Sequence, residues 1–116
     1  KSSQLEELAD QLKQLVEAAD GNYLRQNDYP SWDFEADSPL RDHCLAVYKE
    51  VSGQEARYDA VHAGLECGFL KQALPDCDMI SYGPNIYDVH STKEHLEIDS
   101  VARVWAFTQA LLASMR

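Results

Sequence analysis

Basic residues are scarce in this sequence. Its 116 residues include ten Lys and Arg against twenty Asp and Glu, which gives a formal net charge of −10. Proteins that bind the phosphate backbone of nucleic acids, or an anionic membrane surface, use clustered Lys and Arg side chains. The charge therefore argues against nucleic acid and against a membrane surface as partners. It is typical of an ordinary acidic domain.

Long apolar runs and paired cysteines are also missing. No apolar run approaches the roughly 18 residues that a transmembrane helix needs, and no signal peptide is recognisable. The three cysteines, Cys44, Cys67 and Cys77, form no CxxC pair and no even framework, which favours reduced thiols and a cytoplasmic location. The sequence has no initiator methionine and starts directly in a predicted helix, so we expect a piece of a longer protein.

Helical patterns occupy both ends of the chain. A capping box and a stripe of leucines predict a first helix near the N-terminus. A second helix is expected at residues 38–51, with Ser38 as N-cap and Pro39 at the first helical position. A last helix is expected at about residues 99–114, where it would close the chain against a sheet.

The stretch from residue 60 to residue 98 carries most of the candidate chemistry, including three of the four histidines. Its pattern predicts a short strand at residues 58–62, a helix at residues 65–74 stopped by Pro75, and a second strand at residues 79–82. Strand, helix and strand in this order indicate a parallel pair. The expected fold class is therefore α/β, with helices packed on a small, mainly parallel sheet.

His90 is the candidate metal ligand. It lies in a polar loop between Asp88 and Ser91, and an imidazole on a loop past a buried strand can reach a divalent metal. Zinc needs three or four ligands, so a solvated loop histidine is the alternative. His43, on a predicted helix, and His95, in a run of charges, are both expected to be solvated.

The loop HAGLE, residues 62–66, is a candidate substrate-binding element. Here the backbone amides around Gly64, the carboxylate of Glu66 and the imidazole of His62 could face a substrate. The alternative is a simple turn before a helix whose first turn favours Glu66 electrostatically. Cys67 and Cys77 lack a cationic neighbour in the sequence, so we expect small buried apolar groups rather than reactive thiols.

Several motifs together resemble one known family. They are HAGLECG at residues 62–68, PDCDMIS at 75–81, GPNI at 83–86 and VHS at 89–91, preceded by YPSW at 29–32 and DSPL at 37–40. In this combination the chain closely resembles the C-terminal part of the bacterial aminoacyl-histidine dipeptidases. These are cytosolic zinc metallopeptidases, also called Xaa-His or β-alanyl-histidine dipeptidases and similar to carnosinases.

The resemblance implies a catalytic centre with two zinc ions and a glutamate general base that acts on the metal-bridging water. Only the last histidine ligand of such a centre has a counterpart here, at His90, so this chain would not hold both ions and would contain no catalytic residue. The resemblance also implies that residues 1–34 form the end of a lid domain and a hinge. Residues 35–116 would form the C-terminal portion of the catalytic domain.

The implied function is that of a segment of a zinc-dependent dipeptidase, which hydrolyses short peptides such as Xaa-His dipeptides. His62, Gly64 and Glu66 would line the pocket for the substrate's C-terminal side. The implied partners are the dipeptide substrate and the remainder of the catalytic domain, with a homodimeric parent as one option. The segment alone is expected to be inactive. The alternative is a non-catalytic α/β interaction or assembly module in which His90 is an ordinary loop residue.

Overall fold

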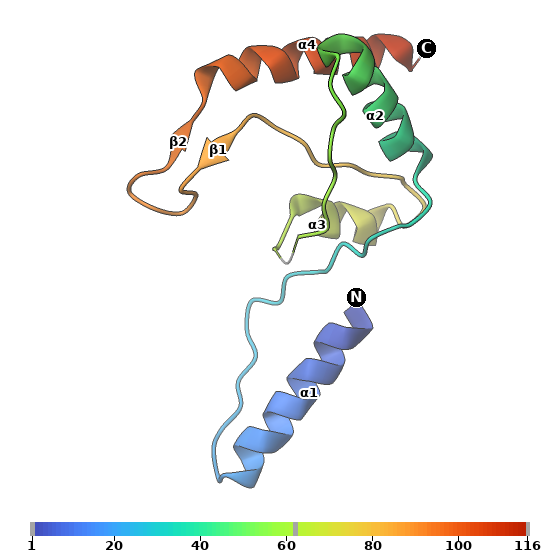
Figure 1. Ribbon diagram of the computed structural model, residues 1–116. Helices are drawn as coiled ribbons and strands as arrows, with labels where there is room; N and C mark the ends of the chain where they lie inside the picture. The colour runs from blue at the N-terminus through green and yellow to red at the C-terminus, as the bar shows by residue number, and fades with distance from the viewer. Residues whose placement is uncertain (1, 62, 116) are drawn as a thin grey trace. The chain divides into compact units, whose positions relative to one another are not determined.

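Four helices dominate the computed structural model, which describes residues 2–61 and 63–115 (Figure 1). In chain order the elements are α1 (Ser2–Ala18), α2 (Pro39–Ser52), α3 (Glu66–Ala73), β1 (Ile86–Tyr87), β2 (His95–Leu96) and α4 (Ile98–Ser114). None of the described helices is long and apolar enough to cross a membrane. Two compact units are formed, Lys1–Ala36 with Ala60–Cys77, and Asp37–Asp59 with Asp78–Arg116.

The predicted α/β fold with a parallel sheet is wrong. Within the described residues the sheet consists of β1 and β2 alone, which are antiparallel, with Ile86 opposite Leu96 and Tyr87 opposite His95. The described parts of the two expected strands, residues 58–61 and 79–82, form no ladder. An apolar run becomes a strand only when another backbone satisfies its N–H and C=O groups.

The side chains of the second misassigned segment pack on helices instead. Ile80 lies against the buried core, and the Tyr82 ring meets the Phe107 ring edge-on with 5.0 Å between centroids. This explains why the segment is apolar although it is not a strand. An extended segment laid over helices has the same composition as a buried strand, so the two cannot be separated by composition.

In the first unit, α1 is tied to the segment that follows it by ion pairs. Both terminal nitrogens of Arg25 donate to the two carboxylate oxygens of Glu6 at 2.9 Å, and Arg25 Nε also bonds Asp28. The hydrogen bonds from Arg25 hold the pKa of Glu6 below its ordinary value. The partners are exposed, so we assign this pairing a role in orientation rather than a large share of stability.

Further along the first unit, α3 packs on the Tyr29-Pro30 corner. The rings of Tyr29 and Phe69 meet edge-on at 4.6 Å, and the buried Gly68 lies directly on the Pro30 carbonyl. Lys71 binds Glu35 at 2.5 Å and donates to the Cys77 carbonyl at 2.8 Å. Thus α3 is held by contacts along its length. It ends at Ala73, one residue earlier than the predicted end at residue 74, and before Pro75.

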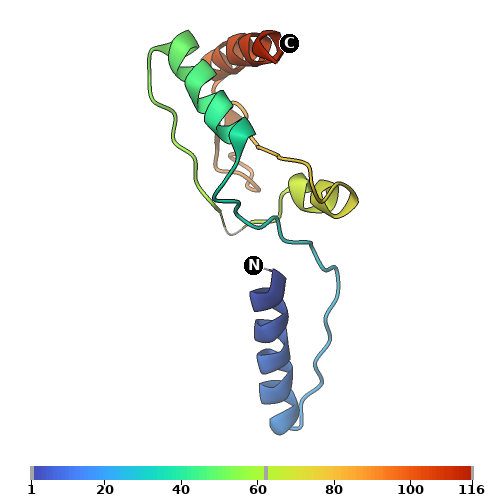
Figure 2. The ribbon, with the colours of Figure 1, turned by 90° about the vertical axis from the view of Figure 1, so that its right-hand side faces the viewer.

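In the second unit, α2 lies beside α4 in both views of the ribbon (Figure 1, Figure 2). The buried apolar side chains of this unit are Cys44, Val47, Phe107 and Leu111. The predicted N-cap of α2 is confirmed, because Ser38 Oγ accepts the Arg41 amide at 3.1 Å and Pro39 is the first helical residue.

Asp78 anchors the chain before β1 onto the same helix end. Its Oδ1 accepts the Ser38 hydroxyl at 2.7 Å, and its Oδ2 accepts the Leu40 amide at 2.8 Å. A carboxylate at a helix N-terminus also satisfies an amide that has no partner within the helix. This one side chain therefore joins two segments that are 38 to 40 residues apart in the sequence.

Candidate functional site

His90 lies in the loop that joins β1 to β2, and this loop is built from two successive turns. The Ser91 amide donates to the Asp88 carbonyl at 3.2 Å, and the Glu94 amide donates to the Ser91 carbonyl at 3.2 Å. The Ser91 hydroxyl donates to the Asp88 carbonyl at 2.7 Å and accepts the Lys93 amide at 3.1 Å. Local hydrogen bonds therefore define the path of the loop without help from a long strand pair.

The backbone of His90 adopts a left-handed conformation, with φ of 61°, and Asp88 does so too, with φ of 52°. Residues other than glycine rarely adopt this region, although His and Asp tolerate it better than most. Glu94 Oε2 accepts the His90 amide at 2.7 Å and so fixes this conformation. The His90 side chain is exposed, and within the described residues its ring makes no hydrogen bond.

The loop is fastened to the start of α4 through Glu97. This carboxylate accepts hydrogen bonds from Arg103 at 2.5 Å, from Asn85 at 2.9 Å and from the Tyr87 hydroxyl at 3.2 Å. The hydrogen bond from Arg103, followed by that from Asn85, holds the pKa of Glu97 below its ordinary value. The buried Ser100 adds a second link, because its Oγ accepts the Asn85 amide at 2.9 Å.

The other two histidines within the described residues, His95 and His43, have local partners. The His95 ring stacks on Tyr87 with 5.2 Å between centroids, and its Nδ1 lies 2.9 Å from the Lys93 carbonyl oxygen. His43 Nε2 lies 2.7 Å from the Ser114 hydroxyl oxygen. Both were expected to be solvated, and both are exposed.

The HAGLE loop leads into α3 in the first unit. Glu66 is exposed in the first turn of α3, and a Cβ placed on Gly64 would come within 2.9 Å of the Tyr29 ring. His62 lies outside the described residues. His90 belongs to the other unit.

The thiols differ from the expectation of buried apolar groups. Cys67 is half-buried and Cys77 is exposed, while the buried thiol is Cys44 in the core of the second unit. Burial, and then the nearby charge of Asp78, raises the pKa of Cys44. A thiol with a raised pKa is a poor nucleophile, which is consistent with a packing role for Cys44.

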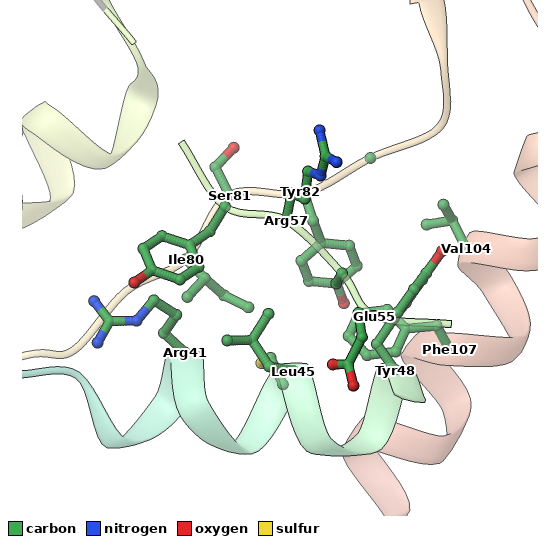
Figure 3. A pocket seen from close by; sticks show the side chains of 14 residues that line it. Arg41, Leu45, Tyr48, Glu55, Arg57, Ile80, Ser81, Tyr82, Val104 and Phe107 are labelled. Carbon is green, nitrogen blue, oxygen red and sulfur yellow. The ribbon is translucent and has the colours of Figure 1, made fainter. Parts of the chain in front are cut away.

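A pocket of about 330 Å³ opens in the second unit above α2, and sequence reasoning missed it (Figure 3). The Arg41 guanidinium lies 4.8 Å from the centre of the Tyr58 ring at one side of it. Arg57 also lines the pocket, but its guanidinium points in a different direction from that of Arg41 (Figure 3). The charged groups do not converge on one point, as recognition of a small ion requires.

Comparison with known proteins gives two close similarities, although no family model matches the chain. The cytosol non-specific dipeptidase of Escherichia coli (strain K12) is 37% identical over 84 residues, which is 72% of this chain and 17% of that protein. The crystal structure of aminoacylhistidine dipeptidase from Vibrio alginolyticus matches with a TM-score of 0.79 and 32% identity, covering 98% of this chain and 23% of that one. The chain is a partial homologue of these dipeptidases. The predicted resemblance is thereby confirmed.

As a partial dipeptidase homologue, the chain spans about a sixth of the curated relative and less than a quarter of the solved one. A dipeptidase metal centre would need several ligands, yet the described residues contain no group of three or more His, Cys, Asp or Glu side chains that could hold a metal ion. His90 can therefore be at most one ligand among others that this part of the chain does not bring to it.

Proposed function

We propose that the chain is part of the catalytic region of a metal-dependent dipeptidase, one that cleaves short peptides such as Xaa-His dipeptides. The observation that carries the proposal is the match of 98% of the chain to the solved aminoacylhistidine dipeptidase, at 32% identity. The cytosol non-specific dipeptidase of E. coli, 37% identical over 72% of the chain, supports the same proposal. A cytoplasmic location goes with this proposal, since the curated relative is named a cytosol dipeptidase.

Within that function we assign His90 the role of a metal ligand. Its support is local: an exposed imidazole is presented by a backbone in a left-handed conformation, which Glu94 holds from inside the same loop. Uncommon backbone conformations of this kind concentrate at functional sites, where surrounding contacts maintain them. Glu97 and Ser100 extend that support, because they fasten the base of the loop to α4.

The complete centre would hold two zinc ions, which polarise the peptide carbonyl and lower the pKa of the attacking water. This chain would position one metal ligand, His90, and form part of the substrate pocket. We assign the pocket role to His62, Gly64 and Glu66. The support is that Glu66 is exposed at the start of α3 and that Gly64 is exposed in the loop that leads into this helix.

The test uses a full-length chimera in which this chain replaces the homologous segment of the E. coli dipeptidase. His90→Ala should lower the zinc content and reduce kcat, because a lost metal ligand acts on the transition state as well as on binding. A fall of roughly 100-fold or more is expected, because losing a residue that only orients a metal ligand already costs about 10- to 100-fold. His95→Ala is the matched control and should keep both zinc and turnover.

Three outcomes would contradict the proposal. Unchanged zinc content and turnover in His90→Ala would remove the assigned ligand. Hydrolysis of β-alanyl-histidine by the isolated chain with added Zn²⁺ would show that the active site is complete without the rest of a dipeptidase. A chimera that folds but never hydrolyses a dipeptide would favour the non-catalytic interaction module.

A further inference from the structure

α4 is apolar on two sides. The side towards α2 carries the buried Phe107 and Leu111. Successive residues of a helix are about 100° apart, which centres a second set of apolar side chains roughly 130° around the helix from the first. We call this set the outer α4 face, and it consists of Ile98, Val101, Trp105 and Leu112, which are 81%, 44%, 62% and 64% exposed.

Charged residues are nearly absent from the whole helix. The 17 residues of α4 include two, Asp99 and Arg103, whereas 26% of the full sequence is charged. Asp99 and Arg103 lie between the two apolar sides, so they do not interrupt the outer α4 face. A helix that is apolar around most of its circumference is typical of burial between two layers of protein, and only one layer is described here.

The β-hairpin carries two further exposed apolar side chains. Ile86 and Leu96 are directly opposite each other in the ladder, so they lie on the same face of the hairpin. They are 49% and 41% exposed. The second unit therefore has exposed apolar side chains on the hairpin as well as on the outer α4 face.

Three kinds of occupant differ in how well they fit. An anionic membrane is disfavoured, because surface-binding helices have Lys and Arg on their polar face and α4 has one Arg. A second copy of this chain is also disfavoured, because two chains that each carry a net charge of −10 repel each other. The third occupant is the remaining polypeptide of a dipeptidase. It is extensive, because this chain covers 23% of the solved relative.

We propose that the outer α4 face is the docking surface for the remainder of the dipeptidase catalytic region, with Trp105 as its central anchor. This inference rests on the proposed function and specifies the partner that completes it. Trp is the largest side chain of the face and lies between Val101 and Leu112 along it. Buried tryptophans at the centre of an apolar patch commonly dominate the binding free energy of an interface.

The experiment co-expresses tagged chain 1–116 with the E. coli dipeptidase from which the homologous segment has been deleted. Capture on the tag detects the complex, and titration of the purified parts gives its Kd. The wild-type chain should bind. Trp105→Glu should weaken binding by about thirtyfold or more, which is the effect of losing a strong interface anchor. Trp105→Phe should retain most of the affinity, because it keeps an apolar ring.

The matched control is Leu24→Glu, which places the same charge on a residue that is 75% exposed in the other unit and should leave Kd unchanged. Circular dichroism and amide exchange of each free variant check the helices. A wild-type chain that forms no complex would overturn the inference, as would a Trp105→Glu variant that binds normally. So would self-association of the wild type that Trp105→Glu abolishes, or unfolding of the free Trp105→Glu chain.

Binding and catalysis are measured separately in this design. A complex that depends on Trp105 but has no dipeptidase turnover would contradict the proposed function and leave the docking surface standing. Turnover of the chimera with no binding of the separate parts would contradict the docking surface and leave the proposed function standing.

Discussion

Replacement of Gly68 by alanine tests the packing of α3 on the Tyr29-Pro30 corner. Gly68 is buried in the first turn of α3, and a Cβ built there would lie 2.3 Å from the Pro30 carbonyl oxygen. Ordinary contacts of a Cβ begin about 1 Å farther away. The obstacle is a backbone atom, so it cannot be removed by a change of rotamer.

Two effects of opposite sign decide the outcome. Alanine is a better helix former than glycine, by about 0.5–1 kcal/mol at an interior position. Overpacking a close contact costs about 1–3 kcal/mol, because backbone must shift to make room. The second effect is the larger, so we expect Gly68→Ala to destabilise the first unit by about 1–2 kcal/mol.

Amide hydrogen exchange of α3 is the appropriate assay, because it reports the stability of one element separately from the other unit. The expected loss corresponds to roughly a tenfold faster exchange. Gly83→Ala is the matched control, since nothing lies within 4 Å of a Cβ at that position. Exchange in Gly68→Ala that is as slow as in the wild type, or slower, would refute the reasoning.

Three further predictions concern the second unit. Asp78→Ala should lower the free energy of unfolding by about 1–3 kcal/mol, measured by urea denaturation, because Ser38 and the first turn of α2 lose their acceptor. The pKa of Glu97 is depressed by Arg103. The ionised Glu97 carboxylate therefore stabilises the hairpin fully above the ordinary carboxyl pKa, and this stabilisation is lost as the pH falls through the lower, folded-state pKa. In that pH range, exchange of the hairpin amides should accelerate in the wild type, after correction for intrinsic rates, and not in Glu97→Gln. His90→Asn should preserve the hairpin, whereas His90→Val should weaken it by about 1–2 kcal/mol, because a β-branched residue tolerates the left-handed backbone poorly; NOE contacts across the ladder measure both.

The helices could be predicted from the sequence because their signals are local. Ser38 and Pro39 mark the start of α2 within two residues, and Pro75 limits α3. The strands could not be predicted in this way, because a strand depends on hydrogen bonds to a second segment, which composition alone does not identify. Residues 79–82 have the composition of a strand, but Ile80 and Tyr82 use it to cover helices.

The candidate site was predictable as a position but not as a conformation. The VHS motif places His90 in a loop, and the loop is where the structure has it. Its left-handed backbone and the bond to Glu94 depend on the folded turn, so the sequence contained no signal for them. The role of Glu97 was missed for a similar reason. Its partners Asn85, Tyr87 and Arg103 lie 6 to 12 residues away and approach it only when the hairpin closes on α4.

The apolar pattern of α4 predicts the helix correctly but does not show how many neighbours the helix has. Val101, Val104, Trp105, Leu111 and Leu112 predict a helix and suggest one inward side, but they divide into two sides once the helix is placed on α2. Phe107 and Leu111 use the side towards α2, while Trp105 and Leu112 stay exposed. A helix with one neighbour needs one apolar side, so a second side indicates a second neighbour. The relatives extend well beyond the residues this chain matches, and we infer that this neighbour belongs to that additional part of a dipeptidase.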